Sequence, residues 1–140
     1  MPTALRNLRS VGLRAFPVLY AKDVESIAAF YARLGFEEFF RLPADGGAAG
    51  YVALRRGDAE MAVTTEETPR ALWGVEPGAG PRHEMFVYVE GVDEEVDRLR
   101  AAGVPVLRDP QDMFWGERVA VVADPEGNLV SLADARRSAP

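Results

Sequence analysis

The chain has 140 residues, a formal net charge of −6 and no cysteine. Phosphate backbones need a concentrated positive surface, so this charge argues against a nucleic-acid partner, and a chain without cysteine has neither disulfides nor thiolate chemistry. No stretch approaches the roughly 20 apolar residues of a membrane-spanning helix, and no targeting segment is visible, so we expect a cytoplasmic protein with no membrane partner.

The first half of the chain predicts a strand, a helix and three further strands. The apolar run from Arg14 to Ala21 predicts a strand, and Pro17 within it favours an edge position because proline cannot donate to a neighbour. Between Asp23, a suitable N-cap, and Gly35, a suitable stop, apolar residues recur at helical spacing. The three strands are predicted at 36–42, 50–55 and 60–64, with Arg56-Gly57-Asp58 as a hairpin turn.

The second half predicts the same order of elements again. Residues 65–82 are rich in Pro, Gly and Glu and predict a linker, with a short helical turn within it as an option. The predicted elements that follow are a strand at 83–90, a helix at 92–102 and strands at 104–108, 115–123 and 128–133, the last two joined by the turn sequence Asp124-Pro125-Glu126-Gly127. The two helical stretches are offset by 68 residues, which indicates a duplication.

This duplication predicts a single domain built from two modules. Its parts are an N-terminal extension at 1–13, a first βαβββ module at 14–65, a linker at 66–81, a second βαβββ module at 82–134 and a C-terminal tail at 135–140.

Several strings together resemble the vicinal oxygen chelate superfamily, which holds glyoxalases, extradiol dioxygenases and bleomycin resistance proteins. They are Pro17–Val24, Ala29–Tyr31 with Leu34–Phe36, Trp115–Arg118 and Asp124–Asn128, and the strings Phe16–Leu19 and Leu54–Asp58 most resemble the bleomycin resistance branch. The resemblance implies an α+β fold in which the two βαβββ modules form a curved mixed-sheet cup. It also implies a homodimer, because a second subunit commonly closes such cups.

The resemblance also implies where a metal ion would be held, by ligands on the first and last strands of each module. The first-strand positions fall on Phe16 and Glu84, and the last-strand position of the second module falls on Ser131. A phenyl ring cannot coordinate a cation and a hydroxyl is a poor ligand for a divalent ion. We therefore expect no metal and no cofactor. The remaining candidates for a metal ligand are Glu84, the unaligned Glu60, and His83, which strand alternation should turn to the face opposite Glu84.

Strand alternation predicts an aromatic lining for the cup instead. The predicted ligand-binding residues are Phe16, Val18, Tyr20, Tyr51, Glu84, Phe86, Tyr88, Phe114, Trp115, Arg118 and Ser131. Arg118 has two alternatives, an anion contact in the cavity or a tie that holds the turn. The aromatic residues have a plainer alternative as well, in which they fill a collapsed core.

From these residues we expect binding or sequestration of a small aromatic molecule, cationic if Glu84 takes part, in a dimeric cavity. The function would be independent of metal, similar to antibiotic resistance by sequestration, and we assign no catalytic residue. The alternative is a metal-dependent enzyme of the glyoxalase or dioxygenase type, and a third possibility is a vestigial cup that serves only oligomerisation.

Overall fold

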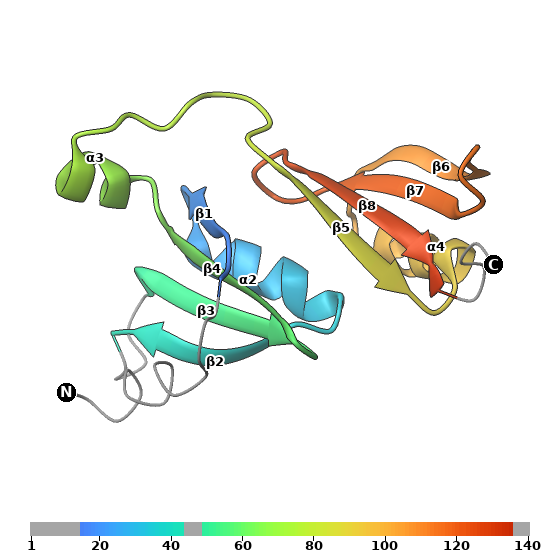
Figure 1. The fold of residues 1–140 in the computed structure, drawn as a ribbon, viewed down its shortest axis with the longest axis horizontal. Coiled ribbons are helices and arrows are strands. Elements are labelled where there is room, and N and C mark those ends of the chain that lie inside the picture. The colour runs from blue at the N-terminus through green and yellow to red at the C-terminus, as the bar shows by residue number, and fades with distance from the viewer. Residues whose placement is uncertain (1–14, 44–48, 136–140) are drawn as a thin grey trace. The chain divides into compact units, whose positions relative to one another are not determined.

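A computed structural model of the chain describes residues 15–43 and 49–135. The chain divides into two compact units, Met1–Pro77 and Gly78–Pro140, and each contains a mixed four-stranded sheet with a helix packed on it (Figure 1). Both units have the order βαβββ, so the predicted α+β class with two such modules is confirmed.

The first unit holds the elements β1 (Val18–Ala21), α2 (Val24–Arg33), β2 (Glu37–Leu42), β3 (Tyr51–Arg56), β4 (Ala59–Thr65) and α3 (Glu67–Trp73). The strand order is β1-β4-β3-β2, with β1 parallel to β4 and the other neighbours antiparallel. The edge position predicted from Pro17 is therefore confirmed for β1. Helix α3 occupies the segment for which the sequence predicts no more than a helical turn.

Helix α2 begins and ends at the residues that the sequence predicts. The Asp23 carboxylate accepts a hydrogen bond from the Ser26 amide at 3.2 Å, and Gly35 adopts a φ of 90°, the left-handed conformation that favours glycine. The helix buries Val24, Ile27 and Tyr31. Because these side chains recur on one stripe, the helix packs that stripe against one face of the sheet. The opposite face of the sheet is not covered by α2.

The second unit holds β5 (Glu84–Val89), α4 (Val92–Ala101), β6 (Val106–Asp112), β7 (Arg118–Ala123) and β8 (Leu129–Asp134). Its strand order, β5-β8-β7-β6, repeats that of the first unit, with β5 parallel to β8. Helix α4 buries Val92, Val96 and Leu99. Its N-cap, Gly91, has no side chain, and the buried Asp134 of β8 accepts a hydrogen bond from the Val92 amide at 3.3 Å.

Two predicted strand boundaries in the second unit are wrong. Strand β7 begins at Arg118, not at Trp115, because the chain first makes a turn in which the Met113 amide donates to the Glu117 carbonyl at 2.7 Å. Strand β6 extends to Asp112 instead of ending at Arg108, and register shifts around Arg108 and before Gln111 accommodate the proline between them.

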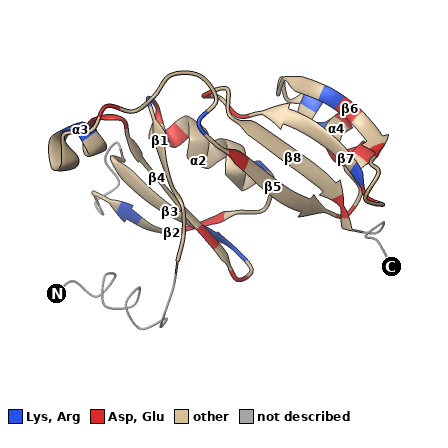
Figure 2. Ribbon diagram, turned by 45° about the horizontal axis from the view of Figure 1, so that its top comes forward, with Lys and Arg blue, Asp and Glu red and all other residues tan. Residues whose placement is uncertain are grey.

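Charged residues are mixed along both units (Figure 2). Arg41 pairs with Glu25 and Glu38, Arg70 pairs with three glutamates of its own unit, and Arg118 pairs with two aspartates. These three arginines are thus balanced by carboxylates of their own unit. Among the helices in the described residues, none is both long and apolar enough to cross a membrane.

Candidate functional site

Strand β5 presents a row of side chains on the face of the second sheet that lies opposite α4. Glu84, Phe86 and Tyr88 alternate with the apolar residues Val87 and Val89, which are buried on the helix side. The rings of Phe86 and Tyr88 lie 5.5 Å apart at an interplanar angle of 56°, with 42% and 45% of each residue exposed. We call this surface, together with Ser131, Trp115 and Glu117, the aromatic face.

At one end of the row, Glu84 is bonded to Ser131. The pairing of Phe86 with Ser131 across β5 and β8 places the serine beside the row, and its hydroxyl donates to Glu84 Oε2 at 2.6 Å. Ser131 is buried, and Glu84 remains exposed. The structure therefore brings together the two positions that the superfamily resemblance aligns with metal ligands in this module.

At the other end, Glu117 holds two aromatic residues. The Tyr88 hydroxyl donates to Glu117 Oε2 at 2.5 Å, and Trp115 Nε1 donates to Glu117 Oε1 at 2.7 Å. The hydrogen bond to the carboxylate raises the pKa of Tyr88 above its ordinary value of 10.0. Sequence reasoning assigned Glu117 no role. The available signal was its alternation with Val119 and Val121, which share the face of Tyr88.

The turn before β7 adds a second aromatic pair to this end. Phe114 and Trp115 meet edge to face, with ring centroids 4.9 Å apart and an interplanar angle of 89°. Phe114 is 95% exposed and Trp115 is 41% exposed. The indole is therefore fixed by Glu117 while the phenyl ring of Phe114 extends beyond it.

Arg118 lies on the helix side of the sheet, away from the aromatic face. Its Nε and Nη2 donate to the two carboxylate oxygens of Asp93 at 2.8 and 3.0 Å, and its Nη1 donates to Asp112 at 3.3 Å. Of the two alternatives for Arg118, this geometry matches the structural one, in which the side chain holds neighbouring segments together. The guanidinium links the start of α4 to the adjoining ends of β6 and β7.

The first unit carries an aromatic row of its own. Tyr20 of β1 pairs with Thr64 of β4, which in turn pairs with Tyr51 of β3, so both phenols share one sheet face. The Tyr51 ring lies 6.1 Å from the Phe40 ring of β2. The sequence did not predict Phe40 here, because a register shift between Glu38 and Phe40 sets its position.

Two other predicted residues lie near this row. Val18 is 43% exposed and pairs with Ala62 on the same face as Tyr20. Phe16 is partly buried and precedes Val18 by two residues, where the Pro17 carbonyl still accepts a hydrogen bond from the Ala62 amide at 3.0 Å. Because side chains alternate along an extended chain, Phe16 lies on the same side of the sheet as Val18 and Tyr20.

The register also locates the metal-ligand position that the sequence left unaligned. Ser131 pairs with Phe86, and the corresponding pair in the first unit is Ala62 with Val18, so the position falls on Ala62 and not on Glu60. The aligned side chains of the first unit then offer a phenyl ring and a methyl group, and those of the second unit offer one carboxylate and one hydroxyl. Neither pair provides the several His or carboxylate ligands that a divalent ion needs. Within residues 15–43 and 49–135, no group of three or more His, Cys, Asp or Glu could hold one.

His83 precedes β5 and is partly buried, and its buried Nε2 has no hydrogen-bond partner among the residues that the structure describes. Burial lowers the pKa of His83 below its ordinary 6.5, and the positive charge of Arg82 acts in the same direction, whereas the carboxylate of Asp124 opposes them.

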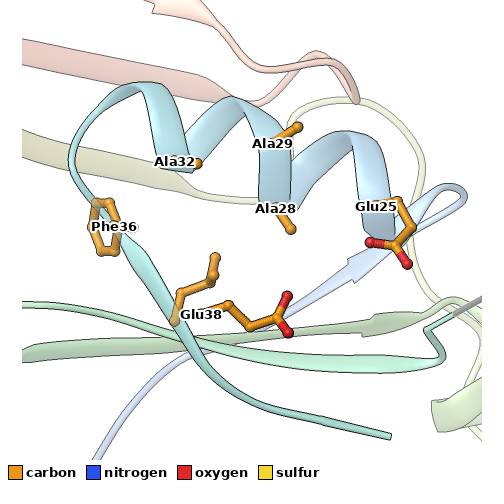
Figure 3. A pocket seen from close by; sticks show the side chains of 7 residues that line it. Glu25, Ala28, Ala29, Ala32, Phe36 and Glu38 are labelled. Atoms are coloured by element: carbon orange, nitrogen blue, oxygen red, sulfur yellow. The ribbon is translucent and has the colours of Figure 1, made fainter. Parts of the chain in front are cut away.

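A separate cavity of about 250 Å³ lies in the first unit between α2 and the sheet (Figure 3). Its lining is Glu25, Ala28, Ala29, Ala32, Phe36, Glu38 and Leu54. Arg41 donates to Glu25 at 3.0 and 3.1 Å and to Glu38 at 2.7 and 2.8 Å, so both carboxylates of the rim share one guanidinium as their counter-charge. None of the predicted site residues lines this cavity.

Comparison with known proteins gives a consistent set of similarities. The profile of the Glyoxalase/Bleomycin resistance protein/Dioxygenase superfamily matches residues 14–132. A bleomycin resistance protein of Klebsiella pneumoniae is 30% identical over 129 residues, covering 85% of this chain and 90% of that protein. The crystal structure of TioX from Micromonospora sp. ML1 is 27% identical with a TM-score of 0.70, covering 86% of this chain and 98% of that one. A lactoylglutathione lyase from Agrobacterium tumefaciens shares the fold, at 21% identity and a TM-score of 0.67, covering 90% of this chain and 96% of that one.

Proposed function

The chain belongs to the glyoxalase/bleomycin resistance protein/dioxygenase superfamily, and from this membership and the geometry above we propose that it binds and sequesters a small planar aromatic cation, without a metal and without chemistry. The relative from Klebsiella pneumoniae is named for bleomycin resistance, which supports a ligand of the antibiotic kind.

The observation that carries the proposal is the exposed aromatic row with a carboxylate at each end. Phe86 and Tyr88 are almost half exposed although they lie on a sheet, so they do not simply fill a core. A stacked ring contributes about 0.5–1.5 kcal/mol beyond its buried area, and a cation over an aromatic face contributes about 0.5–2 kcal/mol. Glu84 and Glu117 add negative charge beside these rings. The surface therefore suits a flat ligand with positive charge.

The chemistry of the aligned donors supports binding over the enzymatic alternative. Glyoxalase or dioxygenase chemistry of this type needs a Lewis acid held by several His or carboxylate ligands. Phe16 and Ala62 supply no donor atom, and Glu84 is bonded to Ser131. We include in the proposal that the protein acts as a homodimer, as the superfamily resemblance implies.

Fluorescence of Trp115 provides the test. The chain has two tryptophans, so a Trp73→Phe variant leaves Trp115 as the single reporter, and Trp73 itself lies in α3 of the other unit. We expect saturable quenching by bleomycin and by 9-aminoacridine, a planar cation, at least tenfold weaker binding of the uncharged acridone, and no change after dialysis against EDTA. Phe86→Leu should weaken binding by about two- to tenfold because one stacking contact is lost.

A different set of results would refute the sequestration proposal. If neither cation quenches Trp115, while added Zn²⁺ or Ni²⁺ produces turnover of the glutathione hemithioacetal of methylglyoxal or of a catechol, the protein is an enzyme and the sequestration proposal fails. Sedimentation velocity at micromolar concentration tests the homodimer, which should have twice the mass of the 15.3 kDa chain.

A further inference from the structure

We propose that the ligand of the aromatic face is a dication, a planar aromatic body with one cationic group at each end. This inference rests on the proposed function and specifies the class of ligand that the same face takes.

The first step concerns the charge of Glu84 and Glu117. Each carboxylate is held by uncharged donors, the Ser131 hydroxyl for Glu84 and the Tyr88 hydroxyl and Trp115 indole for Glu117. Within the part of the chain that the structure describes, neither forms an ion pair. Uncharged donors position a carboxylate without cancelling its charge, so both ends of the row keep a full negative charge.

Two carboxylates elsewhere in the second unit are instead bound by arginine. Asp93 is bound bidentately by Arg118, and Asp109 is bound by Arg100 at 2.5 Å. These carboxylates are balanced from within the chain. The two carboxylates of the aromatic face are available to balance charge that comes from outside.

The second step concerns spacing. Glu84 is the first residue of β5 and Tyr88 lies four residues further along the same strand, with Phe86 between them. At about 3.3 Å per residue, the Cα atoms of Glu84 and Tyr88 lie roughly 13 Å apart. Because the Glu117 carboxylate accepts from the Tyr88 hydroxyl, the two charges lie at the two ends of the Phe86–Tyr88 ring pair. A ligand that stacks along Phe86 and Tyr88 reaches both only if it is cationic at both ends.

The third step concerns why a ligand with one positive charge pairs with only one of the two carboxylates. A monocation that stacks on the row can approach one carboxylate and leaves the other without a counter-charge. A partly exposed charge pair contributes about 0.2–1 kcal/mol, so the second cationic group should tighten binding by roughly 1.4- to fivefold. Holding each carboxylate in place beforehand limits the entropy lost on binding.

The test compares 4′,6-diamidino-2-phenylindole, a planar aromatic dication, with its monoamidine analogue 2-phenylindole-6-carboxamidine, using the emission of the dyes. In the native chain we expect the dication to bind about 1.4- to fivefold more tightly than the monocation. Glu84→Gln and Glu117→Gln should each lower the affinity for the dication by about the same factor. In the double variant the ratio of the two affinities should fall to about one.

Two controls separate charge from packing. Asp97→Asn removes one charge from α4, on the other side of the sheet, and should leave the ratio unchanged within error. Tyr88→Phe removes the phenol that Glu117 holds but keeps the Glu117 charge, and should preserve the preference for the dication. If it abolishes the preference as completely as Glu117→Gln does, the effect comes from packing and the inference is overturned.

The outcomes also distinguish this inference from the proposed function. If both probes bind with equal affinity to the native chain, the ligand need not be a dication, and the proposed binding function still stands. If neither probe binds, and neither bleomycin nor 9-aminoacridine binds, the proposed function itself fails.

Discussion

Glu117 links the two aromatic pairs of the second unit, and its effect can be measured on a single ionisation. Its hydrogen bond with Tyr88 favours the protonated phenol, because a phenolate beside a carboxylate has no proton to donate and repels its neighbour. The organisation of the face thus depends on one carboxylate that accepts two hydrogen bonds.

We predict that Glu117→Gln lowers the pKa of Tyr88 towards 10.0. Ultraviolet titration at the phenolate band, with Tyr88→Phe to identify the Tyr88 component, should show that component above its ordinary pKa of 10.0 in the native chain and shifted down in Glu117→Gln. Because the pKa of Tyr88 is raised in the folded chain, the hydrogen bond between Tyr88 and Glu117 stabilises the fold fully below the unfolded pKa of 10.0. This stabilisation is lost as the pH rises through the folded pKa of Tyr88. Unchanged titration in Glu117→Gln would contradict the hydrogen bond.

His83 should make stability depend on pH in the opposite direction. Its pKa in the folded chain lies below the unfolded value of 6.5, because burial disfavours the imidazolium. The unfolded chain therefore binds the proton more readily, and the contribution of His83 is complete above pH 6.5 and is lost as the pH falls towards the folded pKa. Urea titrations between pH 4 and 8 should show a shallower pH dependence for His83→Gln than for the native chain. Parallel curves would contradict the assignment.

At the level of elements, the N-termini of the duplicated helices α2 and α4 are capped in two different ways. Asp23 caps α2 from the adjacent residue, whereas Gly91 has no side chain and Asp134, far along the chain, caps α4 instead. The local cap is predictable from sequence because Ncap contacts lie within three residues. The distant cap depends on β8 lying beside β5 and under the helix, which local sequence does not reveal.

We predict that Asp134→Ala destabilises the protein more than Asp23→Ala. Removal of an exposed N-cap costs about 1 kcal/mol. Removal of Asp134 leaves the buried Val92 amide without its carboxylate partner, which costs about 1–3 kcal/mol. Urea unfolding monitored by circular dichroism gives both values, with Asp97→Asn on the exposed side of α4 as a control that should change little. Equal losses for Asp23 and Asp134 would contradict the buried role.

The elements also show where sequence patterns stop being informative. Apolar periodicity and glycine stops predicted α2, α4 and the order of the strands β1 to β8, because those signals are local, whereas α3 was not predicted as a full helix. The start of β7 was predicted wrongly at Trp115, since the turn from Met113 to Glu117 is closed by backbone hydrogen bonds that no residue type announces. The role of Glu117 became clear only from its hydrogen bonds with Tyr88 and Trp115, because alternation gives the face of a side chain but not its partners.

At the level of the whole molecule, each unit has a helix-covered sheet with its own buried residues. Leu54 in β3 and Leu132 in β8 are both fully buried, one in each unit. Leu→Ala at such positions costs about 2–5 kcal/mol.

We predict that Leu54→Ala reduces hydrogen-exchange protection first in residues 15–77 and that Leu132→Ala does so first in residues 78–135. Mass spectrometry of peptic peptides resolves the two ranges. A loss of protection that spreads evenly over both ranges in either variant would show that the two units unfold as one.

The amino-acid sequence by itself determined the duplication, the order of elements within the two modules and the family, because each depends on residue identity and local spacing. Only the tertiary structure decided that Ala62 is the fourth aligned position, that Arg118 ties α4 to the sheet, and that Glu117 joins Tyr88 to Trp115. Those facts depend on strand register and on contacts between residues far apart in the chain. A shift of one residue in register turns every side chain to the other face, and sequence spacing alone does not specify that choice.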